Sequence, residues 1–172
     1  EREALPKHLK QQGWPEPKPL RSELHPLGLP DLHTKFPAQV LRVEKANTLY
    51  LLCCDLASCL THRGIPWTIA NPANSLMWWI PQVASLLDLH DVGDVLFDHC
   101  MHGGNRNKTA RLRCHPPAAY STLQVHCDGQ HAHAPWGAKG PGQFYTAEEA
   151  EFPQLLCTRI AQLAAKNLPR HV

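Results

Sequence analysis

Proline is crowded into the first fifth of this chain, and that crowding limits the folds open to it. Seven of the 16 prolines among the 172 residues stand between residues 1 and 37. Because proline fixes φ and lacks a backbone donor, this stretch cannot form a long helix or a central strand. We therefore predict a proline-rich extended arm at residues 1–37 and an α/β domain at residues 38–172. The arm is expected to lie over the domain, and a disordered leader is the alternative. Its candidate anchors are Trp14, Leu20, Leu27, Leu29 and Leu32.

The overall charge gives no strong indication of a polyanionic partner. Lys and Arg number 17 against 15 Asp and Glu, a formal net charge of +2, so a nucleic-acid site would have to be a local patch. No apolar run has the length of a membrane span or the form of a signal peptide. The seven cysteines are an odd number, and the adjacent Cys53 and Cys54 lie in an apolar stretch, which favours reduced, buried thiols over disulfides. We expect a soluble, intracellular protein without a membrane span.

Apolar residues recur at spacings of three and four after Pro37, which predicts a long amphipathic helix that ends at Gly64. The apolar, β-rich run 65–70 then predicts a buried strand. A helix followed by a buried strand favours an α/β sheet. Further strands are expected at 94–99, 110–114 and 123–127, with a helix at 81–89. The first helical pattern uses Val40, Val43, Asn47, Tyr50, Cys54, Ala57 and Leu60.

A final helical region is predicted from a capping box and an apolar stripe. Thr146 and Glu149 have the spacing of a box that opens a helix. Pro153 is expected to kink or restart that helix. The stripe consists of Leu156, Ile160 and Leu163.

A series of short motifs runs through most of the chain. They are Pro19-Leu-Arg-Ser22, Gly28-Leu-Pro30, Ala46-Asn47, Ile69-Ala-Asn-Pro72, Asn74-Ser75, Cys100-x-x-Gly103, Lys108-Thr109, Cys127-Asp-Gly, His131-x-His133 and Pro135-Trp-Gly137. Their order and spacing resemble those of DNA (cytosine-5) methyltransferase-like proteins of phage and mobile-element type. The resemblance covers about Pro19 to Cys157 and corresponds to the C-terminal part of such a domain.

That resemblance implies a partial Rossmann-like methyltransferase sheet with flanking helices, which in such enzymes binds S-adenosylmethionine at the carboxyl ends of its strands. The sequence departs from the pattern of that family in two ways. The glycine-rich cofactor loop and the Pro-Cys loop have no counterpart before Cys53, and Ala70 stands where the family has a glutamate. An alanine methyl group cannot transfer a proton. We therefore expect a degenerate or partial domain, a pseudoenzyme that is non-catalytic alone and takes S-adenosylmethionine only if the missing half is supplied.

A basic stretch after Gly103-Gly104 is the candidate nucleic-acid interface. Alternate residues of a strand share a face, so Arg111 and Arg113 could contact successive phosphates. Asn71, at the family's turn, could hydrogen-bond a base, although an ordinary strand-to-loop turn explains it as well. A solvated hairpin with scattered charges is the alternative for the basic stretch. The predicted nucleic-acid-binding residues are Asn71, Arg106, Lys108, Arg111 and Arg113.

Three cysteines and five histidines between residues 100 and 133 form the candidate metal site. Thiolates and imidazoles are the ligands that close tetrahedral zinc sites. The spacing matches no standard structural pattern, and strand alternation could instead turn several of these side chains into the core. Histidines flank Cys100, but neighbours in a strand point to opposite faces, so a catalytic thiol is not expected. The predicted zinc ligands are Cys100, Cys127, His131 and His133.

Two alternatives to a partial methyltransferase remain open on the sequence. One is a nucleic-acid- or zinc-binding module. The other is a structural subunit that its arm docks into a larger assembly, where a protein partner completes the fold. Exposure of Trp78 and Trp79 would favour the assembly.

Overall fold

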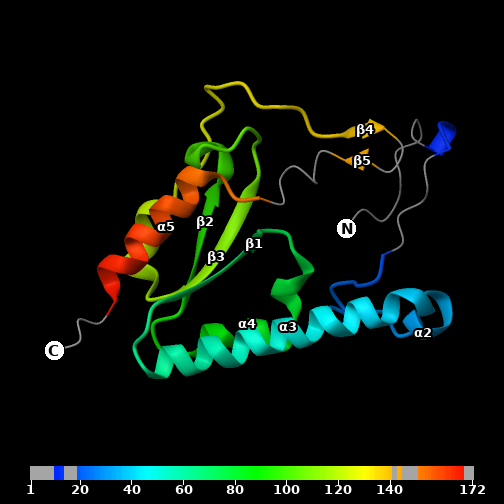
Figure 1. Ribbon diagram of the computed structural model, residues 1–172, viewed down its shortest axis with the longest axis horizontal. Coiled ribbons are helices and arrows are strands. Elements are labelled where there is room, and N and C mark those ends of the chain that lie inside the picture. The colour runs from blue at the N-terminus through cyan, green and yellow to red at the C-terminus, as the bar shows by residue number, and fades with distance from the viewer. Residues whose placement is uncertain (1–9, 14–18, 141–142, 145–150, 169–172) are drawn as a thin grey trace.

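The computed structural model describes residues 10–13, 19–140, 143–144 and 151–168. Helices and small antiparallel sheets give it a mixed α/β fold (Figure 1). None of the described helices is both long and apolar enough to cross a membrane. The α-helices and strands, with the 3-10 helices labelled η, are α2 (Leu32–Lys35), α3 (Pro37–His62), β1 (Trp67–Pro72), η1 (Leu76–Trp79), α4 (Pro81–Ala84), η2 (Ser85–Asp88), β2 (Gly93–Asp98), η3 (His99–His102), β3 (Thr109–His115), η4 (Pro117–Leu123), β4 (Ala138–Gly140), β5 (Gln143–Phe144) and α5 (Gln154–Asn167).

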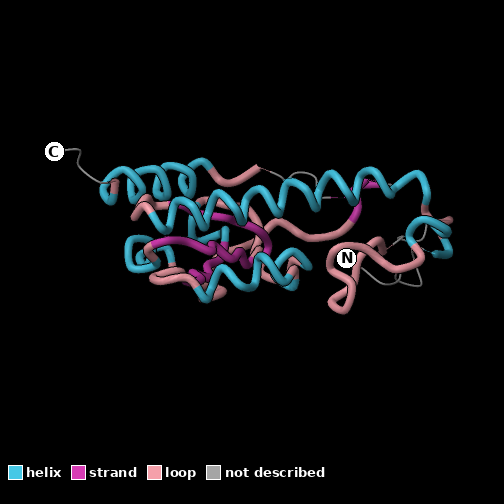
Figure 2. The backbone as a smooth tube through the Cα atoms, turned by 90° about the horizontal axis from the view of Figure 1, so that it is seen from below, coloured by secondary structure: helices cyan, strands magenta, loops and turns pink. Residues whose placement is uncertain are grey.

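The longest element, α3, confirms the predicted helix. Pro37 occupies its first turn, where a missing N–H costs nothing, and Gly64 follows its end with a φ of +64°. Seen from below, α3 runs along most of the molecule (Figure 2). Val43, Cys54 and Ala57 are buried on the predicted face.

The main sheet is antiparallel, with strand order β1–β3–β2. Its strands appear where 65–70, 94–99 and 110–114 were predicted, with small shifts at their ends. The parallel-rich sheet that the methyltransferase resemblance implies is not found, since no described strand pair is parallel. The physical reason is the short link between β2 and β3. Ten residues separate them, fewer than a parallel crossover needs.

The predicted strand at 123–127 is wrong, because backbone groups there find other partners. The Val125 carbonyl accepts a hydrogen bond from the Asp98 N–H, and the Cys127 N–H donates to the Asp98 carboxylate. These contacts hold the segment beside the end of β2 without a strand ladder.

The C-terminal helix begins at Gln154, directly after Pro153. Leu156 is fully buried, and Ile160 and Leu163 pack beside it, so the predicted stripe is confirmed. The predicted helix at 81–89 forms as two short pieces, α4 and η2. Trp14 and the capping box at 146–149 lie outside the described residues.

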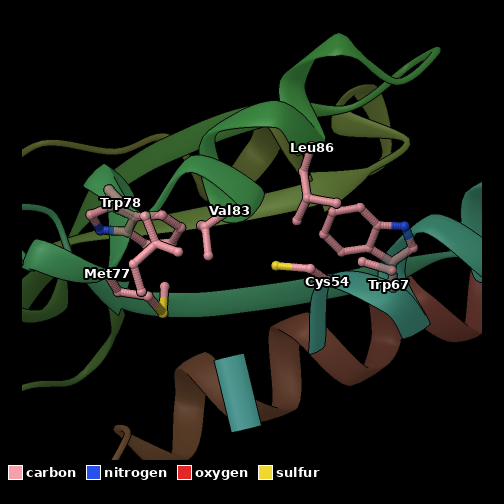
Figure 3. Close-up of a cluster of buried hydrophobic side chains, with 8 residues drawn as sticks. Cys54, Trp67, Met77, Trp78, Val83 and Leu86 are labelled. Atoms are coloured by element: carbon pink, nitrogen blue, oxygen red, sulfur yellow. The ribbon is translucent and has the colours of Figure 1, made fainter. Parts of the chain in front are cut away.

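Two apolar cores lie on opposite faces of the main sheet. Residues of α3, β1, η1, α4 and η2 form the first core (Figure 3), and residues of β2, β3, η4 and α5 form the second. Side chains alternate along β3, so Leu112 enters the second core while Arg113 points toward the first. The first core consists of Cys54, Ala57, Trp67, Met77, Trp78, Ile80, Val83 and Leu86.

The described part of the arm packs against α3 through Arg21. The guanidinium donates to Asn47 Oδ1 at 2.7 Å and to the Val43 carbonyl at 3.2 Å, and it lies over the Tyr50 ring. Leu32, one of the predicted anchors, is buried. Both polar and apolar contacts therefore tie residues 19–36 to the domain.

Arg113 is buried between the sheet and the first core. Its Nε and Nη2 donate to the two Asp94 carboxylate oxygens at 2.8 and 2.9 Å, and its Nη1 donates to the Val83 carbonyl. The guanidinium lies 5.1 Å from the Trp78 ring centroid. All of its charge is thus compensated inside the fold.

We expect Asp94→Ala to lower the free energy of unfolding by about 3–5 kcal/mol, because it leaves the buried Arg113 charge unpaired. The exposed Asp88 provides a matched control, and Asp88→Ala should change the same quantity by less than about 0.5 kcal/mol. Urea denaturation followed by circular dichroism measures both. Equal losses in the two variants would contradict the role given to the buried pair.

Candidate metal centre

Cys100, Cys127, His131 and His133 come together at one end of the main sheet. Their ligand atoms, two sulfurs and two imidazole nitrogens, all lie within 4.8 Å of one another. Cys127 Sγ is 3.9 Å from His131 Nε2 and 3.4 Å from His133 Nε2. With metal–sulfur bonds of about 2.3 Å and metal–nitrogen bonds of about 2.0–2.1 Å, neighbouring ligands of a tetrahedral ion are roughly 3.3–3.8 Å apart. The cluster could therefore hold a metal ion after small side-chain shifts.

The short helix η3 carries Cys100, and a glycine pair makes the turn after it. Gly103 has a φ of +87°, a conformation that favours glycine. A Cβ on Gly104 would lie 2.8 Å from the His99 carbonyl oxygen, so a larger residue would displace the backbone. The two glycines let the chain turn from η3 toward β3 beside Cys100.

The other three ligands come from residues 124–137, which we name the ligand loop. The loop contains no helix or strand and passes the end of the sheet where η3 lies (yellow in Figure 1). Its Ala134 N–H donates to the Asn105 carbonyl at 2.8 Å, and the Gly129 N–H donates to Cys127 Sγ at 3.3 Å. A backbone N–H aimed at a cysteine sulfur would stabilise a thiolate there.

Asp98, at the end of β2, ties the ligand loop to the sheet. Its carboxylate accepts a hydrogen bond from the Thr109 hydroxyl at 2.6 Å and another from the Cys127 N–H at 2.9 Å. Burial opposes ionisation of this carboxyl group, but these hydrogen bonds and the neighbouring His126 together outweigh it and lower the pKa of Asp98. Asp98 is therefore a charged acceptor at neutral pH.

Burial raises the pKa of the Cys100 thiol to about 11, and the neighbouring Cys127 contributes to the rise. The metal-free thiol accordingly keeps its proton at neutral pH and is a poor nucleophile. A bound cation would reverse this preference, because metal coordination deprotonates a thiol.

A cleft of about 820 Å³ opens beside η3 and the ligand loop. Asn71 and Lys108, two of the predicted nucleic-acid-binding residues, line it. Arg106 is not among its lining residues. Its Nε donates to the Pro135 carbonyl at 3.1 Å, and its guanidinium is 5.7 Å from the Trp136 ring centroid. The lining residues are Ala70, Asn71, Pro72, Ala73, Asn74, His99, Asn107, Lys108, Thr109, Trp136 and Phe152.

Arg111 and Arg113 share one face of β3, but that face is turned into the molecule. Arg111 Nη1 is 3.4 Å from Asp94 Oδ2, and its guanidinium lies over the Trp78 ring. Arg113 is 1% exposed. Neither arginine is therefore among the residues that line the cleft, and Arg113 is out of reach of a phosphate.

Comparison with known proteins names no family. No protein-family model, characterised protein or solved structure matches this chain.

Sequence reasoning gave no role to Asp98, Trp136 or Phe152. The sequence did contain a signal for Trp136. It belongs to the Pro135-Trp-Gly137 motif and follows the candidate ligand His133 by three residues. Phe152 carried no such signal. It reaches the cleft because α5 packs on the sheet, and its ring lies 5.6 Å from that of His99.

We expect Asp98→Ala to weaken metal binding by roughly 10- to 100-fold, because the Cys127 backbone loses its acceptor and the ligand loop shifts. Asp98→Asn keeps one acceptor oxygen and should have the smaller effect. Competition with a chromophoric chelator measures the affinity, and Asp88→Ala is the matched control. Unchanged affinity in Asp98→Ala would show that this carboxylate does not position the ligands.

Proposed function

We propose that this chain is a zinc-binding module in which Cys100, Cys127, His131 and His133 hold one zinc ion. The observation that carries the proposal is the convergence of their four ligand atoms within 4.8 Å. Two thiolates and two imidazoles in a tetrahedral arrangement favour zinc over the cations that prefer oxygen ligands. Because the protein would fill all four positions, the ion would be structural rather than catalytic.

A zinc ion at this cluster would fasten the ligand loop to the sheet. No residue of the ligand loop belongs to either apolar core of the described chain. Its attachment rests on a few hydrogen bonds, such as those to Asp98 and Asn105. Metal binding would therefore stabilise the ordered conformation of this loop. It would also fix the position of Trp136, which lines the cleft.

Protein purified under reducing conditions should contain about one zinc ion per chain, because the cluster supplies one complete tetrahedral set of ligands. Cys127→Ser and His133→Ala should each lose most of this metal. Elemental analysis by mass spectrometry measures the content, and the absorption spectrum after cobalt substitution reports tetrahedral thiolate coordination. Affinity should fall as pH is lowered, since the ligands bind only without their protons.

Cys53→Ser is the matched control, since Cys53 is an exposed thiol on α3 outside the cluster. This variant should bind zinc as the unchanged protein does. A chain that takes up no zinc, or that loses zinc equally in Cys53→Ser, would refute the proposed centre.

The cleft favours a second activity, the binding of single-stranded nucleic acid. Trp136 is 44% exposed, and its Nε1 donates to the Asn107 carbonyl at 3.2 Å, which orients the ring. Exposed aromatic rings stack on bases. Lys108 adds a cation for the phosphates. Asn71, whose Nδ2 donates to Met77 Sδ at 3.1 Å, also lines the cleft, where its amide could meet the edge of a base.

We expect Trp136→Ala to weaken binding of a single-stranded oligonucleotide by about 1–3 kcal/mol, the usual loss for one stacked base. Lys108→Ala should lower the slope of log affinity against log salt by about 1. Fluorescence anisotropy of a labelled oligonucleotide at fixed salt concentrations measures both. Trp79→Ala is the control, since Trp79 is 55% exposed but does not line the cleft. Equal losses in both tryptophan variants would count against the cleft.

The resemblance to DNA (cytosine-5) methyltransferases remains a prediction about ancestry, and so does the S-adenosylmethionine site. The described sheets are antiparallel and give no support to a Rossmann-like sheet. Ala70, Asn71 and Pro72 all line the cleft, but none of its described lining residues is a cysteine or an acid. Base methylation would therefore need groups from another segment or chain. The residue types that line the cleft support ligand binding rather than catalysis.

Assembly into a larger structure remains a further proposal for the chain. Trp78 is buried in the first core, so only Trp79 of the adjacent pair presents an apolar surface. A single exposed tryptophan is weak support for a partner at that position.

A further inference from the structure

α3 carries a second apolar row on the side that faces away from the cores. The row follows sequence spacings of four, four, three, four and three. Its four leucines are 61%, 60%, 51% and 54% exposed in chain order. We name this row the outer seam; it consists of Leu41, Lys45, Leu49, Leu52, Leu56 and Cys59, all of them exposed.

The outer seam is unusual for a helix face that meets only solvent. A surface helix normally pairs one apolar face with one polar face, whereas α3 is apolar on both. Figure 1 shows α3 along one edge of the molecule, with the main sheet and α5 on its inner side. A helix of 26 residues is about 39 Å long. The outer seam takes up about 27 Å of it, from Leu41 to Cys59. An apolar row of this length, interrupted only by Lys45, is suited to contact with one other helix.

We propose that the outer seam is the interface of a homodimer in which the α3 helices of two copies pack antiparallel. From Lys45 to Cys59 the spacing matches the a and d positions of a heptad, the pattern by which paired helices interlock. A second copy offers the same row, so one two-fold axis would satisfy both surfaces at once.

The charges of α3 favour a second copy and select the antiparallel direction. Lys45 lies in the row and Asp55 beside it; both are exposed, and neither forms an ion pair within the described part of the chain. In an antiparallel register centred near the middle of α3, Leu49 meets Leu52 of the second copy, and Lys45 meets Asp55 of the second copy. The symmetry gives two such ion pairs. A parallel pair would instead bring the two Lys45 ammonium groups together, which is unfavourable.

Sedimentation equilibrium of the full chain under reducing conditions tests the proposal, and the unchanged protein should be a dimer at micromolar concentrations. Leu49→Glu combined with Leu52→Glu should raise the dissociation constant roughly a hundredfold or more, because four carboxylates would enter the interface. Both leucines are exposed in the single chain, so circular dichroism should show an unchanged fold. Leu24→Glu, at an 87% exposed leucine of the arm, should leave the dimer intact.

A charge exchange tests the direction of the helices. Lys45→Asp and Asp55→Lys should each weaken the dimer by roughly tenfold, since each places like charges together at both ends of the interface. The double variant restores opposite charges in the antiparallel arrangement and should recover the affinity of the unchanged protein. A monomeric unchanged protein, a dimer insensitive to the seam variants, or a double variant without recovery would overturn the proposal. Neither zinc content nor oligonucleotide binding enters this readout.

Discussion

The buried Arg113, paired with the half-buried Asp94, joins the main sheet to the helices that cover it. Arg113 comes from the middle strand β3 and Asp94 from its neighbour β2, while the Val83 carbonyl and the Trp78 ring come from the covering layer. A guanidinium that is 1% exposed is tolerated only where its charge and its donors are satisfied. These contacts therefore fix the strands and the covering helices relative to one another. The metal centre and the cleft both lie at the ends of those strands and depend on that alignment.

At the end of the sheet, Asp98 likewise joins segments that are distant in sequence. Four residues after Asp94 on β2, it accepts hydrogen bonds from β3 and from the ligand loop. A loop with no regular structure thereby brings Cys127 next to Cys100, and its two histidines complete the cluster. The loop then continues to Trp136, which stands at the wall of the cleft. The Cys/His cluster and the cleft are in this way linked through one short segment of chain.

Much of the local structure was predictable because it depends on neighbours in sequence. The spacing of Val43, Cys54 and Ala57 specified α3, and the soft ligands of the region 100–133 suggested the metal cluster by their chemical type. The strand predicted at 123–127 failed because the carboxylate of Asp98, distant in sequence, took the place of a ladder partner. Basic residues of β3 were expected to meet phosphates. Instead Asp94 on β2 pairs with Arg111 and Arg113, a contact that no spacing rule reveals.

By itself the sequence determined the long helix, three strands and the apolar stripe of α5, and it identified the four residues that could hold a metal. Apolar periodicity and the metal affinity of side-chain types are properties of the residues, so they can be recognised without knowledge of the fold. The tertiary structure decided that the sheet is antiparallel, that Arg113 is internal, and that Trp136 and Phe152 share a cleft with Asn71. These outcomes follow from long-range packing, in which a short connection limits the strand direction and burial forces each charge to find a partner.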